Sequence, residues 1–113
     1  MTEISIIKQA TINIRYKNKS VFDLVVRVTK DDGSVYDMTG HELRMDIKKN
    51  WDASSYLYRL TDSDGITITE SNLLTFSKVM ELPNDTYVYD LKDIDDDYFI
   101  MGGLIKVERN ATT

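Results

Sequence analysis

Apolar and polar side chains alternate without a break from His41 to Lys48. Leu43, Met45 and Ile47 fall on one side of an extended chain, and the charged residues between them fall on the other. Successive side chains of a β-strand point to opposite faces, whereas a helix would scatter these residues around its circumference. The segment is therefore predicted to be a strand with one buried face.

The same two-residue period recurs along most of the chain. It is visible in four further segments, 21–29, 66–69, 86–92 and 98–107. Asp-Gly steps at 32–33 and 64–65 supply turn signals between strands. Roughly seven to nine short strands with regularly spaced turns are typical of two sheets packed face to face. We therefore predict an all-β fold, an immunoglobulin-like antiparallel β-sandwich, formed as a single domain by residues 1–113.

Several local features refine this prediction. Residues 35–38 are expected to form a short return strand, and residues 77–82 are the one segment where a helical turn is expected. The glycine pair at 102–103 is expected to mark a bulge or bend in the last strand, where Phe99 and Met101 would share the buried face. The amino-terminal stretch is expected to add one or two strands. Its core candidates are Ile4, Ile6, Ile12 and Ile14.

A tyrosine corner is predicted at the segment Leu82 to Tyr89. In this motif a tyrosine near the start of a strand bonds its hydroxyl to the backbone just upstream, and it is typical of sandwich topology. We assign the role to Tyr87, which follows Pro83 at a spacing of four. The motif predicts structure and carries no functional information.

Composition excludes several classes of function. The chain has 14 basic and 19 acidic residues and a net charge of −5, which argues against nucleic acid and anionic lipid as partners because both need a basic surface. It contains no cysteine, so disulfides, thiol nucleophiles and Cys-ligated zinc are excluded. Its apolar runs are too short for a membrane span. We expect no cofactor and no contact with a membrane.

Candidate catalytic and metal-binding residues are few. His41 is the single histidine, and the sequence holds no nucleophile signature that would use it, so we interpret it as a surface or turn residue. The acidic runs 93–97 and 62–65 lack the spacing of an EF-hand calcium loop and are interpreted as solvated hairpin tips. The sequence therefore predicts no catalytic residue, no metal site and no enzymatic activity.

Three aromatic residues, Trp51, Tyr56 and Tyr58, cluster around a predicted loop. Exposed aromatic rings anchor protein partners and stack on sugar rings. Packing of the loop over the edge of the sandwich is the third interpretation. All three alternatives remain open at the level of sequence.

Several segments resemble one family across nearly the whole chain. They are 31–48, 65–68, 73–77, 82–92 and 102–108. Together these turn and corner motifs resemble the small immunoglobulin-like β-sandwich proteins of tailed bacteriophages. The nearest type is the amino-terminal domain of the baseplate upper protein and its relatives in tail and fibre proteins.

The resemblance implies a non-enzymatic structural protein of the virion, assembled in the bacterial cytoplasm. Its partners would be other virion proteins within a symmetric assembly, docked through the unpaired backbone groups of edge strands. Such relatives often continue into a receptor-binding or fibre region, whereas this sequence ends soon after its last predicted strand. The expected role is therefore an adaptor or docking module of the tail, baseplate or capsid surface. The alternative is a carbohydrate-binding module on a bacterial or phage surface.

Overall fold

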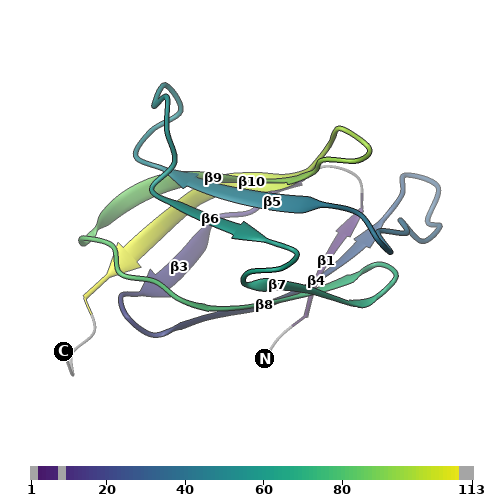
Figure 1. Ribbon diagram of the computed structural model, residues 1–113, viewed down its shortest axis with the longest axis horizontal. Coiled ribbons are helices and arrows are strands. Elements are labelled where there is room, and N and C mark those ends of the chain that lie inside the picture. The colour runs from purple at the N-terminus through teal and green to yellow at the C-terminus, as the bar shows by residue number, and fades with distance from the viewer. Residues whose placement is uncertain (1–2, 8–9, 110–113) are drawn as a thin grey trace.

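Two β-sheets pack face to face in the computed structural model, which describes residues 3–7 and 10–109 (Figure 1). The first sheet contains, in spatial order, β1 (Glu3–Ile7), β4 (Val21–Thr29), β8 (Leu73–Val79) and β7 (Ile66–Glu70). The second contains β2 (Ala10–Thr11), β10 (Tyr98–Glu108), β9 (Asp85–Asp93), β5 (Leu43–Lys48) and β6 (Tyr58–Thr61), with β3 (Ile14–Lys17) also paired to β10.

The predicted all-β sandwich is confirmed, with ten strands among the described residues where seven to nine were expected. The amino-terminal segment accounts for the difference, because it divides into three short strands. No helix occurs in the described part of the chain, and so none there is long and apolar enough to cross a membrane.

The core lies between the two sheets, and strand alternation places its side chains there. Leu43, Met45 and Ile47 of β5 are fully buried, while the residues between them point outward, as the sequence predicts. Phe22 of β4 packs edge-to-face on Phe76 of β8, with ring centroids 6.0 Å apart. Such perpendicular contacts add to the free energy of burying the rings.

The amino-terminal strands pair in parallel, which the antiparallel prediction did not include. β1 runs parallel to β4, and both β2 and β3 run parallel to β10, whereas the pairings within β4–β10 are antiparallel. β1 belongs to the first sheet, and β2 and β3 belong to the second. The amino-terminal segment thus lines the edge of both sheets.

Two short elements differ from their predictions. The helical turn expected at 77–82 is absent, because β8 continues to Val79 and pairs there with Val21. The return strand expected at 35–38 is reduced to one isolated bridge, between Thr29 and Val35. Tyr36 and Met38 are nevertheless buried, so this loop closes one end of the sandwich with side chains.

The bulge in β10 lies before the glycine pair and not at it. The register with β9 shifts between Phe99 and Met101, which leaves Ile100 as the extra residue. The shift moves Phe99 to the outer face, so the prediction that it shares the buried face with Met101 was wrong. The Phe99 ring covers Gly102, where a Cβ atom would lie 2.9 Å from the ring.

The segment assigned as a tyrosine corner has the expected hydrogen bond. The hydroxyl of Tyr87 donates to the carbonyl oxygen of Pro83 at 2.7 Å, and the ring is buried in the core. Tyr89, two residues later, donates its hydroxyl to the carbonyl oxygen of Ile12 at 2.6 Å. These two bonds attach β9 to the loop before it and to the amino-terminal segment.

Candidate functional site

A protruding loop joins β5 to β6 at one end of the sandwich (Figure 1). Asn50 begins its turn, because its side-chain oxygen accepts the amide hydrogen of Asp52 at 3.0 Å. Trp51 is 60% exposed and Tyr56 is 45% exposed, and Leu57 between Tyr56 and β6 is also exposed. This loop of residues 49–57, called the aromatic loop below, therefore presents large apolar side chains to solvent.

An ion pair holds one of these rings in place. The guanidinium of Arg59 lies 3.9 Å from the centroid of the Tyr56 ring. Arg59 also donates two hydrogen bonds to Asp46 of β5, at 2.6 and 3.0 Å. A planar guanidinium satisfies a carboxylate and an aromatic face at the same time. Tyr56 is therefore a positioned ring, and little side-chain entropy remains to be lost when it is bound.

Trp51 and Tyr58 lie in different environments. Trp51 borders a small surface hollow with Asp46 and Asp90, on the outer face of the second sheet. Tyr58 is half-buried against the core, and its hydroxyl accepts the amide hydrogen of Glu81, in the connection between β8 and β9, at 3.0 Å. The structure thus brings Trp51 and Tyr56 to the exposed surface and gives Tyr58 a packing role.

A second group of polar residues lies at the other end of β5, where the interpretation from sequence was wrong. Asp93 is 0% exposed and is not part of a solvated hairpin tip. Its Oδ2 lies 2.6 Å from Nδ1 of His41 and accepts the Tyr36 hydroxyl hydrogen at 2.8 Å. Its Oδ1 accepts the amide hydrogens of Asp95 and Asp96. Both oxygens of this buried carboxylate therefore have hydrogen-bond partners, as burial of a polar group requires.

The electrostatics of this network follow from the buried carboxylate. The hydrogen bond to Asp93 raises the pKa of His41, whose side chain is 23% exposed. Burial raises the pKa of Tyr36, and the bond to Asp93 raises it further. Tyr36 is therefore a neutral donor at any physiological pH, and His41 gains protons more readily than a free histidine.

The network has features that suit a metal ion or a catalytic dyad. Ligand atoms of His41, Asp93 and Asp96 lie within 4.8 Å of one another. The Tyr36 hydroxyl donates to Oδ2 of both carboxylates, however, and His41 also faces Oδ2 of Asp93, so a metal would have to displace these bonds. Among the described residues, no serine hydroxyl is hydrogen-bonded to His41. The hydrogen bonds of this network join loop 30–42 to loop 93–97 and so close this end of the sandwich.

Comparisons with known proteins give no match to this chain, either among protein-family models or among curated sequences.

Proposed function

We propose that this chain is a non-enzymatic, immunoglobulin-like docking module of a phage virion, in the tail, the baseplate or the capsid surface. The aromatic loop is its main contact with another virion protein. The phage assignment comes from the resemblance of the turn and corner motifs. The docking assignment comes from the surface that the sandwich presents.

The strand order supports the immunoglobulin-like part of the proposal. Immunoglobulin sandwiches have the order A-B-E-D in one sheet and G-F-C, extended by C′, in the other. The strands β4, β5, β6, β7, β8, β9 and β10 take the places of B, C, C′, D, E, F and G. The hydrogen bond of Tyr87 adds the corner motif at the start of the F position. The parallel pairing of β1 with β4 departs from that pattern.

The observation that carries the docking role is the exposure of Trp51 and Tyr56 on one protruding loop. Tryptophan, tyrosine and arginine are the residues most enriched at the energetic centres of protein interfaces. Arg59 lies beside Tyr56 and completes such a set. β6 continues directly from the loop and is an edge strand, so its free backbone groups lie next to the aromatic rings.

Mass spectrometry of purified virions tests the proposal. We expect peptides of this chain in the particles, at a copy number that matches the symmetry of the structure it occupies. A few copies per particle would place it in the tail or baseplate, and hundreds would make it a capsid decoration. Absence from particles that contain their other structural proteins would contradict the virion assignment.

The aromatic loop also supports the alternative of a carbohydrate-binding module, because exposed tryptophan rings stack on sugars. Substitution Trp51→Ala separates the two. We expect it to lower incorporation into particles roughly 10- to 30-fold, the effect of removing one interface anchor, without changing the thermal midpoint. The control is Val21→Ala, which removes an exposed apolar side chain from β4 in the other sheet. Normal incorporation of Trp51→Ala, together with loss of binding on a glycan array, would favour the carbohydrate module.

A further inference from the structure

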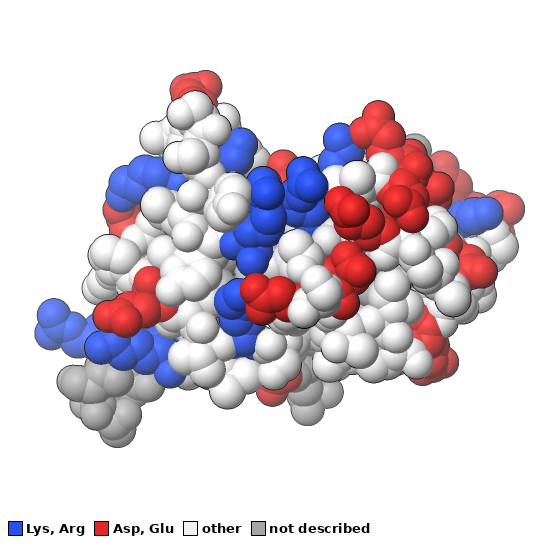
Figure 2. Space-filling view, in the orientation of Figure 1, with Lys and Arg blue, Asp and Glu red and all other residues white. Residues whose placement is uncertain are grey.

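The net negative charge of the chain is concentrated at the end opposite the aromatic loop. The loops 30–42 and 93–97 carry eight carboxylates and one lysine, which leaves eleven carboxylates and thirteen basic side chains elsewhere. Figure 2 shows acidic side chains gathered over this end of the molecule, while most basic side chains lie over its middle and its opposite end. A cationic group is therefore attracted to this end in particular.

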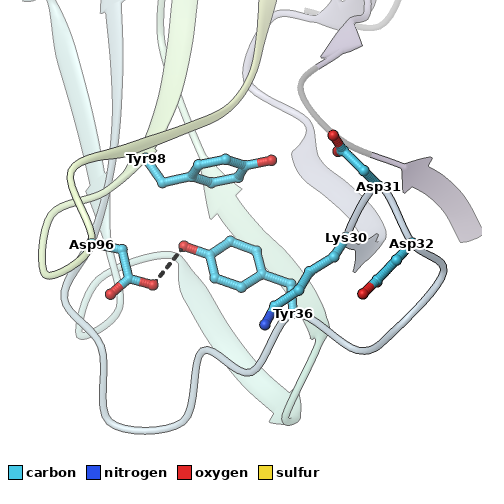
Figure 3. A pocket seen from close by; sticks show the side chains of 6 residues that line it. All are labelled: Lys30, Asp31, Asp32, Tyr36, Asp96 and Tyr98. Carbon is cyan, nitrogen blue, oxygen red and sulfur yellow. Dashed lines mark hydrogen bonds between the residues drawn. The ribbon is translucent and has the colours of Figure 1, made fainter.

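A cleft of about 540 Å³ opens within the acidic end. It is lined by Lys30, Asp31, Asp32, Tyr36, Asp96 and Tyr98. The rings of Tyr36 and Tyr98 lie perpendicular, with centroids 4.9 Å apart. Figure 3 shows Asp96 on one side of this tyrosine pair and Asp31 and Asp32 on the other. The cleft thus places aromatic rings between carboxylates.

The walls of the cleft are held in place before any ligand arrives. The Tyr36 hydroxyl donates to Asp93 and to Asp96, at 2.8 and 3.1 Å, and this fixes the ring. The amide and hydroxyl of Ser34 both donate to Oδ1 of Asp32, at 2.9 and 2.6 Å. The bonds from Ser34 lower the pKa of Asp32, so this carboxylate is charged at neutral pH.

We propose that this cleft receives an arginine side chain of a partner protein. A guanidinium is planar and always charged, and it stacks on an aromatic ring while it pairs with carboxylates. Four of the six lining residues are charged and exposed, and the two tyrosines supply apolar surface between them. Pockets for small ligands are more enclosed, so an arginine carried on a protein surface fits this open cleft better. Because the aromatic loop lies at the other end of β5, the chain would contact two partners at once.

A pair of short peptides tests the proposal on the isolated full-length chain, independently of the particle measurement. The probe is acetyl-Gly-Arg-Gly-amide, and its control carries citrulline, which has the shape of arginine without the charge. Binding is followed by the amide resonances of Tyr36 and Tyr98 in ¹H–¹⁵N spectra at low salt. We expect saturable shifts with the arginine peptide and none with the citrulline peptide.

The chain offers a matched pair of carboxylates. Asp32 and Asp37 lie in the same exposed loop, and each accepts the amide hydrogen of the residue two positions on, at 2.9 Å. Only Asp32 lines the cleft. We expect Asp32→Asn to weaken binding about fivefold and Asp37→Asn to weaken it less than twofold.

Two further variants act on the other parts of the cleft. Tyr98→Leu is expected to weaken binding about fivefold, whereas Tyr98→Phe, which keeps the ring, stays near wild type. Lys30→Gln removes the one basic residue of the wall and is expected to strengthen binding.

Three results would overturn the proposal. Equal weakening by Asp32→Asn and Asp37→Asn would mean a general attraction to the acidic end. Equal binding of a lysine or citrulline peptide would remove the arginine assignment. Shifts of the same resonances by calcium chloride at lower concentration than the arginine peptide would assign the cleft to a metal ion instead.

Discussion

Substitution Asp93→Ala is expected to lower the free energy of unfolding by about 3–5 kcal/mol, because removal of one member of a buried charged network leaves the others without partners. Asp93 is fully buried and interacts with Tyr36, His41 and the amides of Asp95 and Asp96. Alanine would leave two amides and the histidine without this acceptor, and the Tyr36 hydroxyl with Asp96 alone. Urea unfolding followed by circular dichroism measures the change; the fluorescence of the exposed Trp51 is a poor probe of the core.

The same network makes stability depend on pH in a defined direction. Asp93 raises the pKa of His41 above its unfolded value of about 6.5. The contribution of this pair is therefore complete below that value and is lost as pH rises through the folded pKa. Asp93→Asn should remove this dependence, so the difference from wild type should be larger at pH 5.5 than at pH 8.5.

A neighbouring carboxylate provides the control for both measurements. Asp97 lies in the same hairpin turn but is exposed and pairs with Lys92 on the surface. Asp97→Asn should unfold at nearly the wild-type urea concentration, at either pH, because exposed ion pairs contribute little. If Asp93→Ala were no less stable than Asp97→Asn, the buried network would not stabilise the fold.

The buried position of Asp93 could have been predicted from the sequence. Tyr87, Tyr89 and Leu91 alternate on the inner face, and one further step of the same period reaches Asp93. The strand was expected to end at Lys92, because a run of aspartates is typical of a turn. When the alternation of a strand places a charged residue on the buried face, that residue is expected to have a hydrogen-bonding partner. His41, the single histidine of the chain, is one such partner of Asp93.

Other features depended on contacts that periodicity does not encode. The alternation in β4, β5 and β9 predicted their existence and their buried faces. Parallel pairing of β1, β2 and β3 depends on where the amino-terminal segment crosses between sheets, and either direction buries the same side chains. The bulge at Ile100 likewise depends on the register with β9. Phe99 and Ile100 are both apolar, so the sequence does not show which of them faces the core.

The two candidate surfaces differed in how far the sequence could identify them. The aromatic loop was identified as a candidate because Trp51 and Tyr56 lie among turn-forming residues, but the sequence left its role open. The cleft brings together Tyr36, Asp96 and Tyr98, which come from two loops about sixty residues apart in the chain. No local sequence pattern could therefore predict it. Which loops meet at the end of a sandwich is determined by the order of the strands in the two sheets.

Substitution Gly103→Ala is expected to cost about 3–5 kcal/mol of unfolding free energy, although it adds one methyl group. Gly103 has φ of +153°, which side chains rarely adopt. A Cβ atom there would lie 2.7 Å from the carbonyl oxygen of Ile12 and 2.8 Å from Oδ1 of Asn13. The same carbonyl accepts the buried Tyr89 hydroxyl hydrogen, and Asn13 accepts the amide hydrogen of Leu104. Relief of the clash therefore disrupts the hydrogen bonds that attach the amino-terminal segment to β9 and β10.

Gly40→Ala is the matched control, because it introduces a side chain at positive φ without a steric clash. Gly40 also has positive φ, +77°, but nothing lies within 4 Å of the Cβ position. Its substitution should cost only the left-handed penalty of about 1–2 kcal/mol. The excess for Gly103→Ala then measures the close approach of Ile12 and Asn13 together with the less favourable φ of Gly103. If the two variants lost equal stability in urea, the pairing of the amino-terminal segment with β10 would be weaker than its hydrogen bonds indicate.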